Sequence, residues 1–462
     1  MKKQVIKNSV VVAGSFLYCL VLNINLLIPL ILVSIFIYWE AWKERKPADC
    51  RFLHLSLLFL IIFAIGLWSF ENNLEIYYVP FSLIPMLVII LWQDLMISLL
   101  MILACGLPLA IEFRGLDAAV LFLVSATAST VLLVNVRRRS QIIRAGFIVG
   151  IFQAFTWLFI RDFRVVNNAN PYVYFFLNGI FCGIIVVGLL PVFEYIFGRV
   201  TNISLLELSD FNHPILKRLM LEAPGTYHHS LIVGNLSEAA CEAVGANSLL
   251  ARIGAYYHDI GKIEKADYFS ENQNLSVSKH EELSPSMSKL VIINHVKEGE
   301  ALARRYRLNP RITDFIRQHH GKSVVYYFYR RALENGEEDE VISEEGFRYP
   351  GPKPNSKETA IVLLADSVEA ATRALREPTP GRIEQEVHKI VNNKFIDGQL
   401  DECELALKDL EKISGIFIRL LTSIYHSRIT YPSVSRADNH RKSTKENSRP
   451  QEKSKRNSSQ DS

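Results

Sequence analysis

The chain has 462 residues, a net charge of +4 and 49% hydrophobic residues. The charge is uneven: residues 1–200 carry +5, residues 201–436 carry −4 and residues 437–462 carry +3. This distribution excludes a uniformly basic nucleic-acid binder, so we expect no nucleic-acid polymer as a partner. Long apolar runs before residue 200 exclude a wholly soluble protein. Six scattered cysteines without a C-x-x-C pair indicate neither a disulfide framework nor a zinc-thiolate site.

Seven apolar runs occupy most of residues 1–200. A helix that crosses a bilayer needs about 20 apolar residues, and six of the runs fit one crossing each. The first run is 30 residues long, so it fits either one crossing or a short hairpin that turns at Asn23-Ile24-Asn25. We therefore predict a polytopic transmembrane helix bundle with seven or eight crossings. The runs lie near residues 9–38, 52–70, 74–92, 95–111, 118–135, 142–160 and 173–197.

Basic loops orient this bundle in the lipid bilayer. Lysines and arginines gather at residues 43–51 and again at residues 137–144, and short basic loops stay on the cytoplasmic side of a membrane. This places residue 198 onward in the cytoplasm. Asp94, Glu112, Asp117 and Asp162 lie at or near the expected loop ends, and His54 lies near the start of a helix. The sequence therefore favours a membrane anchor or sensor over a transporter.

Histidine is the unusual feature of the second predicted domain, residues 201–436. Ten of the twelve histidines lie here, and eight of them fall between residues 213 and 320. The segment is otherwise of ordinary charge and reads as mostly helical. Clustered histidines in an all-helical domain are its main chemical signal.

Two helices are predicted to carry parts of a site. Apolar residues spaced by three and four predict an amphipathic helix over residues 247–263. Gly261 is expected to end it, so that His258 and Asp259 lie in its last turn. A second helix is predicted over residues 357–375. Its apolar run leads directly into Asp366, where a half-buried carboxylate needs a partner such as a metal ion.

Seven histidine and aspartate side chains are candidate metal ligands. They are spread too widely for a local finger, so a helical scaffold must bring them together. Imidazoles and carboxylates without thiolates suit iron, manganese or zinc, and the mixed nitrogen and oxygen set favours iron or manganese. Seven ligands exceed what one tetrahedral ion needs, which favours two divalent metal ions with Asp259 between them. The candidates are His229, His258, Asp259, His295, His319, His320 and Asp366.

Such a pair of ions suits phosphate chemistry. Two ions about 3.5–4 Å apart can activate a water and stabilise an in-line displacement at phosphorus. Asp259 as the bridge and Lys262 as a positive partner for a phosphate oxygen are therefore the catalytic candidates. Gly261 keeps the backbone uncluttered, so Gly261 and Lys262 are also the candidate substrate-binding residues. Whether His228 and His280 take part stays open.

These motifs resemble known families. His229, His258-Asp259 with Gly261-Lys262, and Asp366 resemble the HD metallophosphohydrolase superfamily. The stretches EAPGTYHHSLIVGNLSEAA, ARIGAYYHDIGKI, YFSENQ, QHHGKS, FRYPGPKP, LLADSVEAATR and DGQLDECELAL resemble the bacterial seven-transmembrane HD-domain proteins, which are PgpH-like cyclic di-AMP phosphodiesterases. The similarity is dense in the cytosolic half and weak in the membrane half.

The resemblance implies a fold and an activity. It implies a multi-pass protein of the bacterial inner (cytoplasmic) membrane whose all-helical HD domain faces the cytoplasm. It implies two iron or manganese ions and the hydrolysis of a cyclic dinucleotide, cyclic di-AMP, to linear pApA. It also implies how the ligands divide. One ion would be held by His229, His258, Asp259 and Asp366, and the other by Asp259, His295, His319 and His320.

Alternatives remain open beside this interpretation. FRYPGPKP differs from the Gly-Tyr-Pro signature of HD domains that cleave cyclic di-GMP, which disfavours that substrate. Cyclic di-GMP or another nucleotide stays an alternative, as does a receptor or transporter whose HD domain only regulates it. A homodimer also stays open. Residues 437–462 contain no large apolar side chain, so we predict a disordered polar tail.

Overall fold

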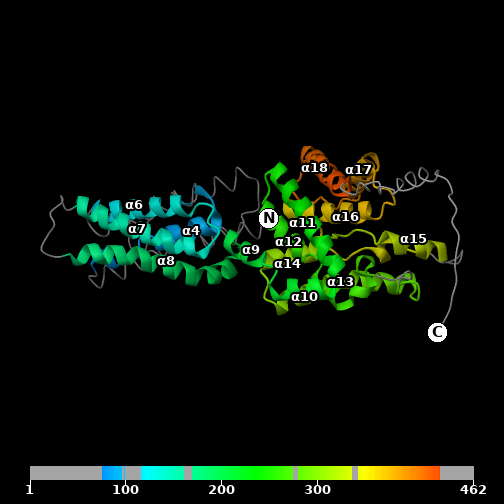
Figure 1. The fold of residues 1–462 in the computed structure, drawn as a ribbon, viewed down its shortest axis with the longest axis horizontal. Coiled ribbons are helices and arrows are strands. Elements are labelled where there is room, and N and C mark those ends of the chain that lie inside the picture. The colour runs from blue at the N-terminus through cyan, green and yellow to red at the C-terminus, as the bar shows by residue number, and fades with distance from the viewer. Residues whose placement is uncertain are drawn as a thin grey trace, which may run out of the picture.

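Figure 1 shows an elongated molecule in which one group of helices continues into a second. The structure is a computed structural model, and it describes residues 75–95, 98, 116–160, 169–273, 279–335 and 342–426. Those residues form helices, with no β-strand beyond one isolated bridge among them. The all-α prediction is thereby confirmed. The apolar runs before residue 74, most of the run near 95–111 and the predicted tail lie outside the described residues.

The membrane half is a bundle of long apolar helices. Three of them are long and apolar enough to cross a membrane, and they coincide with the last three predicted runs. They pack against a shorter apolar helix, and together they share one hydrophobic core. The helices are α4 (Leu83–Trp92), α6 (Leu116–Leu133), α7 (Arg139–Ile160) and α8 (Asn170–Phe197).

The run near residues 74–92 is interrupted and does not form one continuous helix, and its crossing of the membrane stays a prediction. A single 3₁₀ turn, η2 (Ile76–Tyr78), precedes α4, and the chain is extended at Val79. Pro80 explains the break, because a proline disfavours helical backbone at the residue before it. The ten residues of α4 rise about 15 Å, which is half of a bilayer core. Residues 83–91 are all buried, so this half-length helix lies inside the bundle.

Asn178 satisfies the backbone at this break. Its side-chain amide on α8 donates to the carbonyl oxygens of Tyr77, at 3.1 Å, and Val79, at 3.0 Å. Non-helical backbone at membrane depth needs such partners, since lipid offers none. The run is largely apolar, and the polar residue that satisfies the backbone at its break lies about a hundred positions further along the chain.

Helices α7 and α8 approach each other through four glycines. Gly146 and Gly150 lie one turn apart on α7, and Gly179 and Gly183 lie one turn apart on α8. A Cβ atom on Gly179 would lie 2.4 Å from the backbone nitrogen of Gly150, and one on Gly146 would lie 2.6 Å from the carbonyl oxygen of Gly179. The two backbones are therefore in direct contact, as small-residue pairs allow in membranes.

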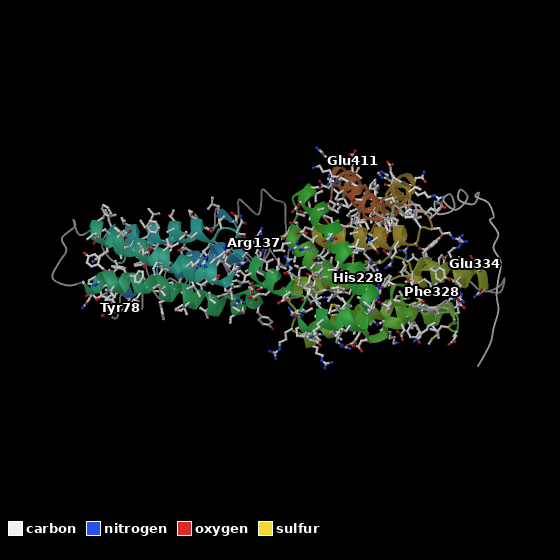
Figure 2. The ribbon with its side chains drawn as sticks, in the orientation of Figure 1. Tyr78, Arg137, His228, Phe328, Glu334 and Glu411 are labelled. Carbon is white, nitrogen blue, oxygen red and sulfur yellow. The ribbon has the colours of Figure 1, made fainter. Side chains whose placement is uncertain are left out.

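A short helix, α9 (Asn202–Leu208), joins the two halves. The buried carboxylate of Glu194, near the end of α8, accepts hydrogen bonds from the backbone nitrogen and the hydroxyl of Thr201 at the start of α9. Arg139 at the start of α7 forms a bidentate pair with Glu207 of α9, at 2.6 and 2.9 Å. Figure 2 places Arg137 at the end of the bundle that faces the second half and Tyr78 at the opposite end. The basic loop thus lies on the side of the histidine-rich domain.

The second half is an all-helical domain with two hydrophobic cores. One core joins α11, α12, α14, α16, α17 and α18, and the other joins α9, α10, α12, η3, α13 and α14. Helices α12 and α14 contribute to both cores. The elements are α10 (Pro214–Glu222), α11 (Pro224–Val244), α12 (Ser248–Tyr257), η3 (Ile260–Tyr268), η4 (Ser270–Asn272), α13 (Pro285–Arg305), α14 (Pro310–Gln318), α15 (Tyr326–Asn335), η5 (Glu344–Phe347), α16 (Lys357–Arg373), α17 (Pro380–Ile396) and α18 (Leu407–His426).

The two helices predicted to carry the site differ in how well they match. Helix α16 confirms its prediction, and Ser356 and Thr359 form a reciprocal cap at its start. Helix α12 ends one turn early, at Tyr257, where the chain passes into the 3₁₀ segment η3. His258 and Asp259 therefore form the junction between the two segments rather than a last helical turn, and Gly261 lies inside η3 instead of ending α12.

Candidate metal centre

The structure brings all seven candidate ligands together from five places in the domain. His229 lies in α11, His258-Asp259 at the α12–η3 junction and Asp366 in α16, while His295 lies in α13 and His319-His320 directly follow α14. They form two groups, and within each group one potential ligand atom per residue lies within 4.8 Å of the others. One group is His229, His258, Asp259 and Asp366, and the other is Asp259, His295, His319 and His320.

Asp259 belongs to both groups, and each of its oxygens faces a different one. Oδ2 lies 3.2 Å from Nε2 of His258 and 3.8 Å from Nε2 of His229. Oδ1 lies 3.3 Å from Nε2 of His295 and 3.5 Å from Nε2 of His319. The side chain is almost completely buried. A carboxylate held in this way can bridge two cations.

The imidazoles are oriented by hydrogen bonds on their far sides. Nδ1 of His258 contacts the carbonyl oxygen of Ala255 at 2.6 Å, and Nδ1 of His295 contacts that of Ile292 at 2.5 Å. Nδ1 of His319 lies 3.0 Å from a carbonyl oxygen in the last turn of α14. A carbonyl only accepts, so each Nδ1 is the donor. With Nδ1 protonated, the Nε2 of a neutral ring presents a lone pair to the centre.

Two imidazole nitrogens that point their lone pairs at each other indicate whether a cation fits between them. Nε2 of His295 and Nε2 of His319 lie 3.2 Å apart, and neither neutral ring could donate to the other. A cation about 2.1 Å from each nitrogen removes this conflict. Nε2 of His258 and Oδ1 of Asp259 are also buried without a hydrogen-bond partner among the described residues. The donor set therefore fits metal ions.

Without a cation, protons would have to take its place. Burial lowers the pKa of the His258 imidazole, but the carboxylates of Asp259 and Asp366 together outweigh burial and raise that pKa to about 10. Burial likewise raises the pKa of Asp259, yet His258 and Lys262 hold it well below its usual range. Metal ligands must be deprotonated, so metal binding at this centre would release protons.

Asp366 and His320 belong to different groups and lie close to each other. Oδ1 of Asp366 lies 3.0 Å from Nε2 of His229, and Oδ2 lies 3.5 Å from Nδ1 of His320. His320 thus presents Nδ1 where the other rings present Nε2. The ring of Tyr349, from the FRYPGPKP stretch, stacks on His320 with centroids 4.2 Å apart. This stacking fixes the plane of the imidazole that is the most exposed of the five.

Lys262 lies at the edge of the centre, held between two carboxylates. Its Nζ is 2.7 Å from Oδ2 of Asp259 and 2.8 Å from Oε1 of Glu271. Burial would lower the pKa of Lys262, but these two charges raise it. Burial likewise raises the pKa of Glu271, and Lys262 lowers it to about 2. The ammonium group is therefore positively charged beside the candidate metal ligands.

Gly261 is buried against α13 rather than beside open space. A Cβ atom there would lie 1.8 Å from the carbonyl oxygen of His295 and 2.5 Å from the backbone nitrogen of Gly299. This close approach explains the glycine through packing, and the expectation that it keeps the backbone uncluttered is wrong. Its binding of substrate stays a prediction.

The two histidines that the sequence left open lie outside both groups. His228, labelled in Figure 2, precedes His229 in the sequence of α11, and its ring packs edge-on against Tyr227. Nε2 of His280 contacts the carbonyl oxygen of Tyr268 at 2.9 Å.

Three residues around the centre were missed by sequence reasoning. They are Glu271, Tyr349 and Glu369, whose Oε2 lies 2.5 Å from Nδ1 of His229. Glu369 had a signal, because it follows Asp366 by three residues and such pairs share a helix face. Glu271 and Tyr349 lie in stretches without helical periodicity, so nothing local indicated where their side chains point.

Comparisons with known proteins agree with this arrangement. Residues 18–201 match the family model described as a 7TM receptor with intracellular HD hydrolase, and residues 226–371 match the HD domain model. The chain is 43% identical over 320 residues to the cyclic-di-AMP phosphodiesterase PgpH of Bacillus subtilis, which covers 68% of this chain and 45% of that protein. It is 37% identical over 391 residues to PgpH of Listeria monocytogenes, covering 82% of this chain and 53% of that protein.

A solved structure is similar to the second half. The crystal structure of the L. monocytogenes PgpH HD domain in complex with cyclic-di-AMP is 42% identical, and the match covers 47% of this chain and all of that one with a TM-score of 0.45. The chain spans about half the length of the curated relatives it matches. The two family models adjoin in the order that the fold shows, membrane bundle first and histidine-rich domain second. The chain therefore belongs to the family of seven-transmembrane proteins with an intracellular HD hydrolase domain.

Proposed function

We propose that this chain is a membrane-anchored, two-metal phosphodiesterase that hydrolyses cyclic di-AMP to linear pApA. The observation that carries the proposal is the buried cluster of seven ligands, in which each oxygen of Asp259 faces a different group. The names of the relatives from B. subtilis and L. monocytogenes supply the substrate. We assign the ligand roles to all seven residues and propose manganese or iron as the two ions, since the set contains nitrogen and oxygen donors without thiolate.

The proposed reaction adds one water across one phosphodiester. The water oxygen bonds to phosphorus, and the ester bond to the ribose 3′ oxygen breaks. That oxygen leaves with a proton as a hydroxyl group, so the product is linear with a 5′ phosphate. Two divalent cations would supply Lewis acidity and make a bound water acidic enough to act near neutral pH. No serine or cysteine nucleophile is required.

The side chains of this protein would hold the two ions and orient the substrate. The carboxylates of Asp259 and Asp366 and the five imidazoles provide the ligand atoms. Lys262 is kept charged by Asp259 and Glu271, so it can stabilise negative charge on a phosphate oxygen. We propose the same edge of the centre, with Gly261 in the backbone, as the substrate-binding side.

We further propose that residues 1–200 anchor the protein in the bacterial inner membrane and that residues 201–436 face the cytoplasm as the catalytic domain. The three long apolar helices support the anchor. The position of Arg137 supports the orientation, because the basic loop lies at the end of the bundle next to the catalytic domain (Figure 2) and basic loops stay cytoplasmic. Residues 437–462 would then form a polar tail on the same side.

Turnover by the purified full chain in detergent tests the function. Samples loaded with Mn²⁺ or Fe²⁺ are incubated with cyclic di-AMP, cyclic di-GMP and ppGpp, and the products are separated by chromatography. We expect pApA from cyclic di-AMP, and loss of turnover to background in Asp259→Ala. Glu238→Gln is the matched control, since Glu238 of α11 pairs with Arg252 of α12 and neither residue belongs to the two ligand groups. Light scattering on the same sample tests the homodimer.

Two outcomes would contradict the proposal. A folded chain with two bound metal ions that leaves cyclic di-AMP intact would refute hydrolysis and favour a regulatory, nucleotide-binding HD domain. Faster turnover of cyclic di-GMP or ppGpp than of cyclic di-AMP would keep the phosphohydrolase and refute the substrate.

A further inference from the structure

The histidines of the two groups differ in the hydrogen-bond partners of their Nδ1 atoms. In His258, His295 and His319, Nδ1 contacts a backbone carbonyl oxygen. In His229, Nδ1 lies 2.5 Å from Oε2 of Glu369, a carboxylate. Among the four rings that present Nε2 to the centre, His229 is the one backed by a full negative charge.

Glu369 is placed for this contact by the same helix that carries a ligand. It follows Asp366 by three residues in α16, and only 1% of its surface is exposed. Both side chains therefore project from one face of α16 toward α11, where Oδ1 of Asp366 meets Nε2 of His229 and Oε2 of Glu369 meets Nδ1. One imidazole is thus held between two carboxylates of a single helix.

A carboxylate behind a metal-binding imidazole has a known physical effect. It accepts the Nδ1 proton, fixes the tautomer and makes Nε2 a more basic ligand, and its removal weakens metal affinity about 10- to 100-fold. The nearby cations do not cancel this contact. Arg373 lies 4.0 Å from the same oxygen and is over a third exposed, and Lys262 pairs with Asp259 and Glu271 instead.

Charge divides unequally between the two groups as a result. We call the group of His229, His258, Asp259 and Asp366 the Asp366 position, and the group of Asp259, His295, His319 and His320 the three-histidine position. They share the charge of Asp259. The Asp366 position adds the charge of Asp366 and, behind His229, that of Glu369, whereas the three-histidine position adds only neutral rings.

We propose that Glu369 is a positioning residue which makes the Asp366 position the tighter of two unequal cation sites. The Asp366 position fills first and keeps its ion when the three-histidine position is empty. The inference rests on the proposed function only in taking the centre to bind two divalent cations, and it does not depend on the substrate.

Manganese binding by the full chain in detergent, without substrate, tests the proposal. Free Mn²⁺ is counted by its electron paramagnetic resonance signal during a titration of the metal-free protein. We expect two bound equivalents with different affinities. Glu369→Gln keeps the shape and an acceptor oxygen but removes the charge, and we expect it to weaken the tighter equivalent about 10- to 100-fold while the weaker one stays unchanged. Glu238→Gln, an identical change elsewhere, should alter neither.

Two variants, each of which impairs one cation site, show which site Glu369 affects. In His319→Ala, which removes a ligand of the three-histidine position, Glu369→Gln should weaken the remaining equivalent by the same factor. In Asp366→Asn, which impairs the other position, Glu369→Gln should have no further effect. Glu369→Asp keeps the charge at a greater distance and should lie between wild type and Glu369→Gln. If Glu369→Gln does not fold, the affinities of Glu369→Asp test the role of Glu369 instead.

Three results would overturn the inference. They are equal affinities in the wild type, unchanged affinities in both Glu369 variants, and equal weakening of both equivalents. Because no substrate is present, these results are separate from the proposed hydrolysis. A chain that binds two unequal Mn²⁺ ions but leaves cyclic di-AMP intact would refute the substrate and leave the role of Glu369 in place.

Discussion

Gly261→Ala should separate a packing role of this glycine from a substrate-binding role. The added Cβ would lie 1.8 Å from the carbonyl oxygen of His295 and 2.5 Å from the nitrogen of Gly299. Both atoms belong to the backbone of α13, so no side chain can swing aside. Helix α13 would have to move by about 1 Å, carrying His295 away from the centre. Overpacking of this kind costs about 1–3 kcal/mol, which lowers Tm by about 2–12 °C for a domain of this size.

Thermal unfolding and metal content of the full chain measure the effect together. We expect Gly261→Ala to lower Tm, to lose manganese from the three-histidine position and to lose turnover. Gly415→Ala is the matched control, because no atom lies within 4 Å of its Cβ position in α18. There alanine should hold or raise Tm, since it favours helix over glycine. An unchanged Tm with full metal content and a raised KM would refute the packing argument and support substrate binding at Gly261.

Three further changes test the other parts of the structure. Gly179→Ala should separate α7 from α8, because its Cβ would lie 2.4 Å from the backbone of Gly150. The fraction of folded protein in detergent should fall, and an unchanged fraction would contradict the backbone contact. Glu194→Gln should weaken the cap on α9 by about 1–3 kcal/mol, since Thr201 donates to this buried carboxylate; faster proteolysis at the α8–α9 junction is the readout, and an unaltered rate would count against it. Chelation of divalent metals should lower the Tm of the histidine-rich domain by removing about 2.7 kcal/mol if free metal was at 100 times its Kd; a Tm insensitive to chelator would argue against metal ligation by the cluster.

Sequence spacing located the membrane crossings well where the helices are continuous and poorly where one is broken. The runs that became α6, α7 and α8 were predicted within a few residues, because a long apolar stretch has few other stable forms in lipid. The run near 74–92 looked the same by composition. Its break at Pro80 is stabilised by Asn178 of α8, a partner that no local pattern could reveal.

The histidine-rich half shows the same division. The candidate ligands were recognisable by residue type and motif, and the structure brings all seven into one cluster. The end of α12 was misplaced by a turn, since Gly261 is a helix-stop residue by propensity but is required here by contact with α13. Propensity is a weak prior that tertiary packing overrides.

The sequence by itself determined the helical class, the order of a membrane half before a histidine-rich half, and the chemical types of the candidate metal ligands. These follow from apolar run length, from charge and from side-chain chemistry, which are local properties of the chain. Only the tertiary structure decided which oxygen of Asp259 faces which histidines, that Glu369 lies behind His229, and that Lys262 is held by Glu271. Those relations join residues up to 140 positions apart, and they depend on how α11, α13 and α16 pack around the end of α12.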